Sequence, residues 1–150
     1  MALSNSTILI VDDDALNLKV LQSVLTEPGY RLLIAKSGER ALYQVEHHIP
    51  DLILLDVLMP GIDGFETCRR LKENPATANI PIIFTTALSD IDSKVKGFEA
   101  GGVDYVTKPF HRAEVLARVK THLTIHYLRR QLEDALARLE QQSAPEDPPH

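Results

Sequence analysis

Short apolar runs alternate along the chain with segments of helical periodicity. Five of the runs read as buried strands, because their apolar residues are nearly consecutive and turn residues bound them. The third run is apolar without interruption over residues 52–55, which is typical of a strand buried on both faces of a parallel sheet. The predicted strands cover residues 7–11, 31–35, 52–56, 80–85 and 104–106.

Segments with apolar residues at helical spacing follow these runs. The first segment continues until Pro28, the second until Pro50, and the fourth ends at Gly101. The third contains Cys68, the only cysteine, which we interpret as a small packing residue rather than a nucleophile. Regular alternation of strand and helix predicts an α/β protein whose parallel sheet is covered by helices on both faces. Ligands of such sheets bind outside the carboxyl ends of the strands.

The last helical segment, which begins near His111, is longer than a small sheet needs. Its first apolar series comprises Val115, Leu116, Val119 and Leu123. Its second series alternates spacings of three and four, as a heptad seam does, and comprises Ile125, Leu128, Leu132, Ala135 and Leu139. At a rise of about 1.5 Å per residue, this second part would project by roughly 25 to 30 Å. We expect one domain over residues 1–124, a helical extension suited to a coiled coil over 125–142, and a disordered tail over 143–150.

Two of the predicted strands lead into acidic residues. The first is followed by Asp12, Asp13 and Asp14, and the third ends at Asp56. In neighbouring parallel strands these carboxylates would meet, and like charges about 4 Å apart repel by roughly 1 to 4 kcal/mol. Such a cluster needs a cation, a shared proton or a basic partner. Oxygen ligands in a shallow site suit Mg²⁺ or Mn²⁺ better than Zn²⁺. We interpret Asp14 as the cap of the following helix and not as a member of the site.

Two later strand ends supply complementary groups. The fourth predicted strand is followed by Thr86, and the fifth by Lys108. A carboxylate beside a divalent ion and an ammonium group can attack phosphorus, because the two cations neutralise charge on the phosphoryl oxygens. A hydroxyl such as that of Thr86 can then bind those oxygens. The strand ends together predict phosphoryl chemistry.

Composition and charge narrow the classes of partner. The 150 residues carry a formal net charge of −5, and residues 1–110 hold 15 acids against 10 lysines and arginines. An acidic domain argues against direct binding of nucleic acid, which needs a basic face. No apolar run reaches the ~20 residues of a membrane span, and residues 1–7 do not resemble a signal peptide. We therefore expect a cytoplasmic protein that does not associate with a membrane.

Five fragments of the chain match the pattern of one family, in the same order. They are Ile8-Leu-Ile-Val-Asp-Asp-Asp14, Leu54-Leu-Asp-Val-Leu-Met-Pro-Gly-Ile-Asp-Gly64, Thr86-Ala87, Gly97-Phe-Glu-Ala-Gly101 and Asp104-Tyr-Val-Thr-Lys-Pro-Phe110. Over about residues 6–124 the chain thereby resembles the receiver domain of two-component response regulators. The resemblance implies a flavodoxin-like, doubly wound, five-stranded parallel sheet in the order 2-1-3-4-5, here with an extended C-terminal helix.

The resemblance also implies a role for each site residue. Asp56 would accept a phosphoryl group from a histidine kinase or a phosphotransfer protein. Asp13, Asp56 and the backbone carbonyl of Leu58 would bind Mg²⁺, and Asp12 would hold the ion through water. Lys108 would grip the phosphoryl group. The domain would then be a signalling module and not an enzyme, since it catalyses only its own phosphoryl transfer and slow dephosphorylation.

Thr86 and Tyr105 would form the switch of such a receiver domain. Phosphorylation would draw Thr86 inward and vacate space that the ring of Tyr105 fills. This would reshape the surface formed by the fourth helix, the fifth strand and the fifth helix, and so control partner binding or dimerisation. A cis peptide bond is also expected before Pro109.

Two leucines near the site suggest a slow loss of phosphate. Leu58 and Leu88 lie two residues after Asp56 and Thr86, at positions where a polar side chain could orient a hydrolytic water. We therefore predict slow self-dephosphorylation.

Two alternative functions stay open at this point. The first is a degenerate receiver that acts as a constitutive dimerisation scaffold, against which the intact acids, Thr86 and Lys108 argue. The second is a haloacid-dehalogenase-like phosphatase, which also uses an aspartyl nucleophile on a parallel sheet. That class needs a second acid two residues after the nucleophile, and Leu58 occupies this position.

Overall fold

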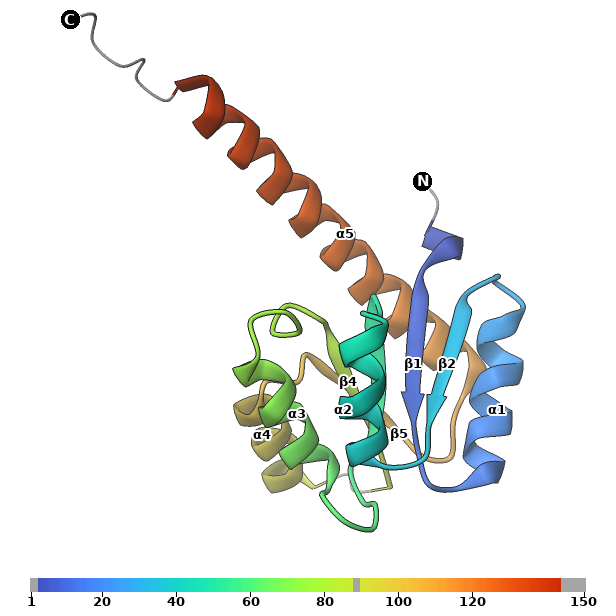
Figure 1. The fold of residues 1–150 in the computed structure, drawn as a ribbon. Helices are drawn as coiled ribbons and strands as arrows, with labels where there is room; N and C mark the ends of the chain where they lie inside the picture. The colour runs from blue at the N-terminus through green and yellow to red at the C-terminus, as the bar shows by residue number, and fades with distance from the viewer. Residues whose placement is uncertain (1–2, 88–89, 144–150) are drawn as a thin grey trace, which may run out of the picture.

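The fold is a five-stranded parallel sheet between two layers of helices (Figure 1). The computed structural model describes residues 3–87 and 90–143. The sheet order β2-β1-β3-β4-β5 and the parallel direction of every pair confirm the expected fold class. The strands are β1 (Thr7–Val11), β2 (Arg31–Ala35), β3 (Leu52–Asp56), β4 (Ile82–Thr86) and β5 (Asp104–Thr107).

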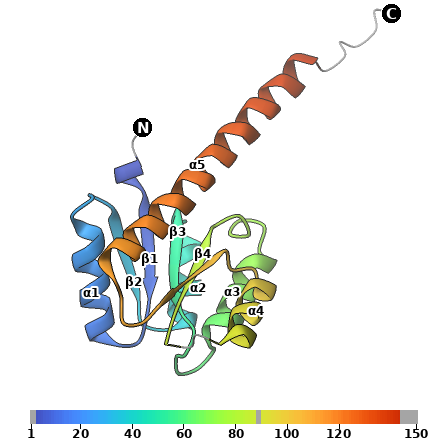
Figure 2. The same cartoon turned by 180° about the vertical axis from the view of Figure 1, so that it is seen from behind.

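The helices divide between the two faces of the sheet. Helices α1 (Ala15–Thr26) and α5 (Arg112–Ser143) cover one face, as the view from behind shows most clearly (Figure 2). The other face carries α2 (Gly38–His47), α3 (Gly64–Glu73) and α4 (Ile91–Ala100). A short 3₁₀ helix, η1 (Leu3–Asn5), precedes β1. Within residues 3–87 and 90–143, no helix is both long and apolar enough to cross a bilayer.

Alternate residues of each strand contribute to two separate cores. On β1, Ile8 and Ile10 pack with α1 and α5, whereas Leu9 and Val11 pack with α2, α3 and α4. Strand β3 is buried at every position, which explains its uninterrupted apolar run. The central strands are therefore held from both sides, and their carboxyl ends have little freedom to move.

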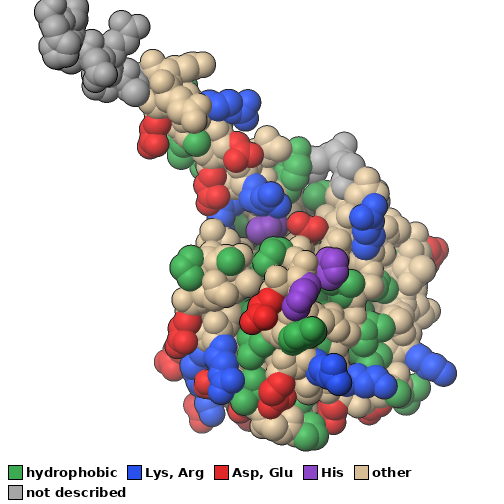
Figure 3. Space-filling model, viewed as in Figure 1, with side chains coloured by type: hydrophobic (Ala, Val, Ile, Leu, Met, Phe, Trp, Pro, Cys, Tyr) green, Lys and Arg blue, Asp and Glu red, His purple; other side chains and the backbone are tan. Residues whose placement is uncertain are grey.

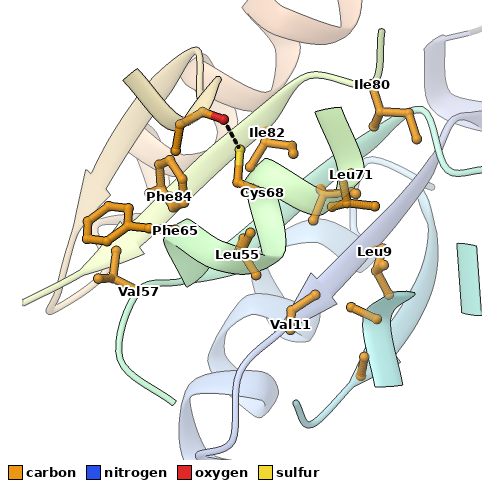
Figure 4. Packing of buried hydrophobic residues seen from close by; sticks show 14 of the residues in the cluster. Leu9, Val11, Leu55, Val57, Phe65, Cys68, Leu71, Ile80, Ile82 and Phe84 are labelled. Atoms are coloured by element: carbon orange, nitrogen blue, oxygen red, sulfur yellow. Dashed lines mark hydrogen bonds between the residues drawn. The ribbon is translucent and has the colours of Figure 1, made fainter. Parts of the chain in front are cut away.

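Cys68 belongs to the core beneath α3 (Figure 4). It is fully buried, and its Sγ donates a hydrogen bond to the carbonyl of Ala100. Burial raises the pKa of this thiol to about 11, so the reactive thiolate is scarce at neutral pH. The interpretation of Cys68 as a packing residue is confirmed.

The two later strands differ from the predicted ranges by one or two residues. Strand β4 begins at Ile82 rather than at residue 80, because Pro81 has no N–H to donate and the N–H of Ile80 instead bonds the carbonyl of Thr77 in a turn. Strand β5 continues to Thr107, one residue further than predicted. Apolar pattern alone does not report such turns.

Helix α5 is 32 residues long and packs on the domain only over its first part. Its buried residues are Val115, Val119 and Leu123. Beyond them the helix projects away from the domain (Figures 1 and 2), and its large hydrophobic residues are 37% to 60% exposed. Ser143 is helical although we expected it in the tail, and the rest of the predicted disordered tail, residues 144–150, lies outside the described residues.

Candidate functional site

Three carboxylates converge at the carboxyl ends of β1 and β3. Asp12 and Asp13 follow β1, and Asp56 is the last residue of β3. One carboxylate oxygen from each lies within 4.8 Å of the others. Asp12 and Asp56 are buried, with 1% and 4% of their surface exposed, and Asp13 is exposed. The sheet order reverses between these strands, which is the usual place for a ligand in an open α/β sheet.

The backbone after β1 explains how Asp12 and Asp13 are held. The N–H of Asp14 donates to Oδ1 of Asp12 over 2.9 Å, which turns the chain immediately after the strand. Asp14 then caps α1 by accepting from the N–H of Leu16 over 2.8 Å. The cap role predicted for Asp14 is confirmed, and the turn leaves Asp13 open to solvent.

Lys108 provides the positive charge beside the two buried carboxylates. Its Nζ lies 3.0 Å from Oδ1 of Asp56 and 3.3 Å from Oδ2 of Asp12. Burial alone would lower the pKa of Lys108, but the hydrogen bond and the charges of the two aspartates outweigh it and raise the pKa above its ordinary value. The lysine precedes a cis peptide bond to Pro109, as expected from the resemblance. Lys108 is therefore an ammonium ion aimed at the carboxylate cluster.

The carboxyl group of Asp56 is harder to ionise than an ordinary aspartate. Burial raises its pKa from 3.8 to about 6, with Lys108 opposing the shift and the negative charges of Asp12 and Asp13 adding to it. At neutral pH the group is ionised in most molecules and desolvated on most sides. A carboxylate that is ionised but poorly solvated is activated as a nucleophile toward an electrophilic partner.

The donor set of the cluster fits a hard divalent cation. Within the described residues, Oδ2 of Asp12 is buried without a hydrogen bond, although it lies within ion-pair distance of Lys108. A buried carboxylate oxygen with an unused lone pair is costly unless a cation or a water reaches it. Carboxylate oxygens of Asp12, Asp13 and Asp56 around a position partly open to solvent match the preferences of Mg²⁺ and Mn²⁺. The predicted ligands Asp12, Asp13 and Asp56 are brought together.

Leu58 lies in the loop between β3 and α3, two residues beyond Asp56. Its side chain is 62% exposed, and the loop is anchored on either side of it. Val57 donates its N–H to the carbonyl of Thr85 over 3.1 Å and accepts from the N–H of Gly64 over 2.8 Å. The role of the Leu58 carbonyl as a metal ligand stays a prediction. Leu88, the other leucine considered for slow dephosphorylation, lies outside the described residues.

Thr86 and Tyr105 lie on adjacent strands. Thr86 is the last residue of β4 and only 1% exposed, and its carbonyl accepts the N–H of Lys108 over 2.8 Å. Tyr105 lies opposite Phe84 on β5 and is 6% exposed. Burial raises the pKa of its phenol, whose hydroxyl donates to the carbonyl of Ser93 in α4. The ring is thus buried against α4, and the movement expected of it on phosphorylation stays a prediction.

Sequence reasoning did not identify Gly64 as a structural part of the site. A Cβ atom there would lie 2.3 Å from the carbonyl oxygen of Asp56 and 2.9 Å from the Cα of Val57. The preceding residue, Asp63, caps α3 by accepting from the N–H of Glu66 over 2.8 Å. A glycine directly after a cap was a visible signal, but only the packing shows that it lets α3 touch the end of β3.

Comparisons with known proteins agree on one family. A family model described as "Response regulator receiver domain" matches residues 8–120. The response regulator PleD of Caulobacter vibrioides is 41% identical over 117 residues, which cover 78% of this chain and 26% of PleD. The chain therefore spans about a quarter of the length of that relative.

Solved structures agree with the sequence comparison. A putative response regulator from Chloroflexus aurantiacus is 46% identical with a TM-score of 0.78, covering 80% of this chain and 98% of that one. The receiver domain of the sensor histidine kinase PA1611 from Pseudomonas aeruginosa, solved with a magnesium ion in its active site cleft, is 30% identical with a TM-score of 0.75, covering 80% and 98%. This chain belongs to the response regulator receiver domain family of two-component signalling proteins.

Proposed function

We propose that Asp56 is the phosphoacceptor of this receiver domain and takes its phosphoryl group from a phosphohistidine of a histidine kinase or phosphotransfer protein. An Asp56 carboxylate oxygen forms the new bond to phosphorus. The phosphorus–nitrogen bond of the donor breaks, and the released imidazole nitrogen takes a proton from solvent. The domain acts as a signalling module and not as an enzyme on other substrates.

The arrangement of Asp56 and Lys108 carries this proposal. A buried carboxylate 3.0 Å from an ammonium group, at the mouth of an acidic cluster, has a nucleophile and a counter-charge in place before any donor arrives. Lys108 can pair with the negative charge of the carboxylate before the transfer and with that of the phosphoryl oxygens after it. Thr86 ends the adjacent strand β4, and its hydroxyl would bind the same oxygens.

Mg²⁺, or Mn²⁺ in its place, would be held by Asp12, Asp13, Asp56 and the carbonyl of Leu58. The bound ion would neutralise charge on the phosphoryl oxygens. Isothermal titration with MgCl₂ should show binding to the wild-type chain, and Asp13→Asn should weaken it at least tenfold. Asp14→Asn is the matched control, because asparagine caps a helix as well as aspartate does. Equal affinity of all three chains would exclude Asp13 as a ligand.

Phosphorylation of Asp56 is tested directly with a small donor. Incubation with acetyl phosphate and Mg²⁺ should add one phosphoryl group, seen as a mass increase that alkaline hydroxylamine removes. Asp56→Asn should abolish the increase, and Asp14→Asn should retain it. A wild-type chain that stays unmodified by acetyl phosphate and by beryllofluoride would refute the proposed function and favour the scaffold.

Slow self-dephosphorylation is proposed from Leu58. Its exposed apolar side chain stands beside Asp56 and offers no hydrogen bond to an attacking water. Leu58→Asn combined with Leu88→Glu should shorten the lifetime of the phosphoryl group at least several-fold. The lifetime is measured from the rate at which the added mass disappears. An unchanged lifetime would show that these side chains do not limit hydrolysis.

The readout we propose is the surface of α4, β5 and α5, which Tyr105 links to the site. Its output includes pairing with a second copy of the chain through the extension of α5. The exposed side chains there are Ile125, Leu128, Leu132, Leu136 and Leu139. Figure 3 shows hydrophobic side chains among charged ones on this projecting segment. An apolar stripe along a solvated helix is the pattern of a coiled-coil partner surface.

Dimerisation is tested by sedimentation with and without beryllofluoride and Mg²⁺. The wild-type chain should sediment partly as a dimer, and Leu132→Glu should be monomeric. Gln141→Glu, a charge change at an exposed position of the same segment outside the stripe, is the control. A monomer at every concentration in both states would refute pairing through the extension.

We further propose a cytoplasmic location, no association with a membrane, and no direct contact of this chain with nucleic acid.

A further inference from the structure

The hydroxyl group of Tyr105 lies against one turn of helix α4. It donates a hydrogen bond to the carbonyl of Ser93 over 2.5 Å, and the carbonyl of Lys94 is 3.2 Å away. Gly97 lies one turn further along the helix, beside the same hydroxyl oxygen. Ser93 and Gly97 are four residues apart, the spacing at which an α-helix joins a carbonyl to an N–H. The hydroxyl therefore lies against the turn of α4 that runs from Ser93 to Gly97.

Gly97 makes the room that this hydroxyl needs. A Cβ atom at position 97 would lie 1.9 Å from the oxygen of Tyr105 and 2.7 Å from its Cζ. Both distances are far shorter than van der Waals contact. No side chain at position 97 is compatible with the tyrosine ring where it lies.

Helix geometry gives no other reason for a glycine at this position. Among the described residues, the glycines with positive φ are Gly29, Gly61 and Gly101, so the backbone of Gly97 is one that alanine adopts readily. Glycine inside a helix is less favourable than alanine, because it loses more conformational freedom on folding. Gly97 therefore makes the helix less stable. The tyrosine hydroxyl occupies the space that a side chain at position 97 would fill.

Neighbouring rings prevent Tyr105 from moving sideways. Its ring centroid lies 5.6 Å from that of Phe84 and 5.6 Å from that of Phe98. Phe84 is fully buried and is itself packed against Gly102, where a Cβ atom would lie 2.4 Å from a ring carbon. A side chain at position 97 would therefore drive the tyrosine ring outward.

We propose that Gly97 is the positioning residue of the Tyr105 switch: it admits the hydroxyl to the Ser93–Gly97 turn of α4 and so keeps the ring inward. The strand of Tyr105 leads on to Lys108, which is bonded through its N–H to Thr86, so ring and site share one pair of strands. The switch role of Tyr105 rests on the proposed function, but the position of its ring is measurable without any phosphoryl chemistry.

The first test follows the ring by NMR in the full chain labelled with carbon-13 at the tyrosine ε positions. The chain has four tyrosines, and Tyr105→Phe identifies the signal of interest. A soluble gadolinium agent should leave the Tyr105 signal of the wild type sharp. In Gly97→Ala it should broaden that signal as strongly as the signal of Tyr43, which is 60% exposed. A Tyr105 signal that stays sharp in Gly97→Ala would overturn the proposal.

The second test uses the sign of a stability change. Helix propensity alone predicts that Gly97→Ala raises the Tm. The proposal predicts a lower Tm in the wild-type background and a drop that is removed or reversed in the background of Tyr105→Leu. Leucine lacks the hydroxyl oxygen and Cζ that the new Cβ would meet most closely, which leaves Cδ2 of Phe84 at 3.1 Å. A raised Tm in both backgrounds would overturn it.

A Gly97→Ala chain that fails to fold is still informative. Recovery of folding by Tyr105→Leu in the double variant would support the proposal, and failure to recover would contradict it. The proposed function is tested separately from the role of Gly97. A wild-type chain that accepts no phosphoryl group on Asp56 would refute that function and leave the ring position and the Tm values as they are.

Discussion

Burial of Asp56 opposes its ionisation, and this opposition has a measurable consequence for stability. Its pKa is 3.8 in an ordinary environment and about 6 in the folded chain, chiefly because of burial. The folded chain then binds this proton more tightly than the unfolded chain does. The corresponding stability is fully present below 3.8 and is lost as the pH rises through about 6.

Asp56→Asn should therefore stabilise the chain at neutral pH. With a chelator present, we expect the free energy of unfolding in urea to rise by about 1 to 3 kcal/mol relative to wild type. The gain should shrink toward zero as the pH is lowered below 3.8, where Asp56 is protonated in both states. Asp14→Asn should change stability little at either pH. A wild-type chain as stable as Asp56→Asn at neutral pH would contradict the raised pKa.

Lys108 holds the pKa of Asp56 down against burial and the other acids. Among the ion pairs of the described residues, it is the cation paired with Asp12 and Asp56. Lys108→Met should raise the pKa of Asp56 further above about 6, because the hydrogen bond and the positive charge are both removed. NMR titration of the carboxyl carbon of Asp56 measures the change. Lys120→Met, at an exposed position on α5, should leave the titration unaltered.

At the scale of elements, helix α3 and strand β3 support the site through direct backbone contact at Gly64. Gly64→Ala places a methyl group against the carbonyl of Asp56 and the Cα of Val57, neither of which can rotate away. We expect a loss of about 1 to 3 kcal/mol in the free energy of unfolding, as for other overpacked cores. The exposed Glu73→Ala on the same helix should stay within about 0.5 kcal/mol of wild type. Urea denaturation compares the two variants, and equal stability would show that α3 can shift without cost.

Pattern and spacing predicted the elements well wherever a local signal existed. The first three strands have the predicted bounds because consecutive apolar residues end at turns or acids, and the acids of β1 and β3 meet because parallel strands share an edge. The start of β4 was missed because a proline turn, not hydrophobicity, sets it. The inward ring of Tyr105 and the contacts of Gly64 and Gly97 depend on packing between distant segments, which no local pattern reports.

At the scale of the whole molecule, the site and the extension lie at opposite ends of the domain. Helix α5 runs antiparallel to the strands, so it leaves the sheet at the edge away from Asp56 (Figure 1). Contacts near that exit come from Asp51, whose Oδ2 accepts the N–H of Thr7 over 2.8 Å and whose Oδ1 lies 3.9 Å from Arg130. A signal from the phosphoryl site must cross the domain through its packed layers to reach the extension.

The extension beyond these contacts should depend on a partner for its helicity. A solvated helical segment of this length is marginal in water, although its continuity with the docked part of α5 spares it the cost of nucleation. Hydrogen exchange of residues 131–143 should therefore be fast in dilute solution and slow at concentrations where the chain dimerises, while β1 and β3 stay protected throughout. Leu132→Glu should keep the fast exchange at every concentration, because a charge in the stripe prevents pairing. Gln141→Glu, at an exposed position outside the stripe, should behave as wild type. Equal protection in dilute and concentrated solution would mean that the helix is stable on its own and that the exposed leucines do not serve to pair two copies.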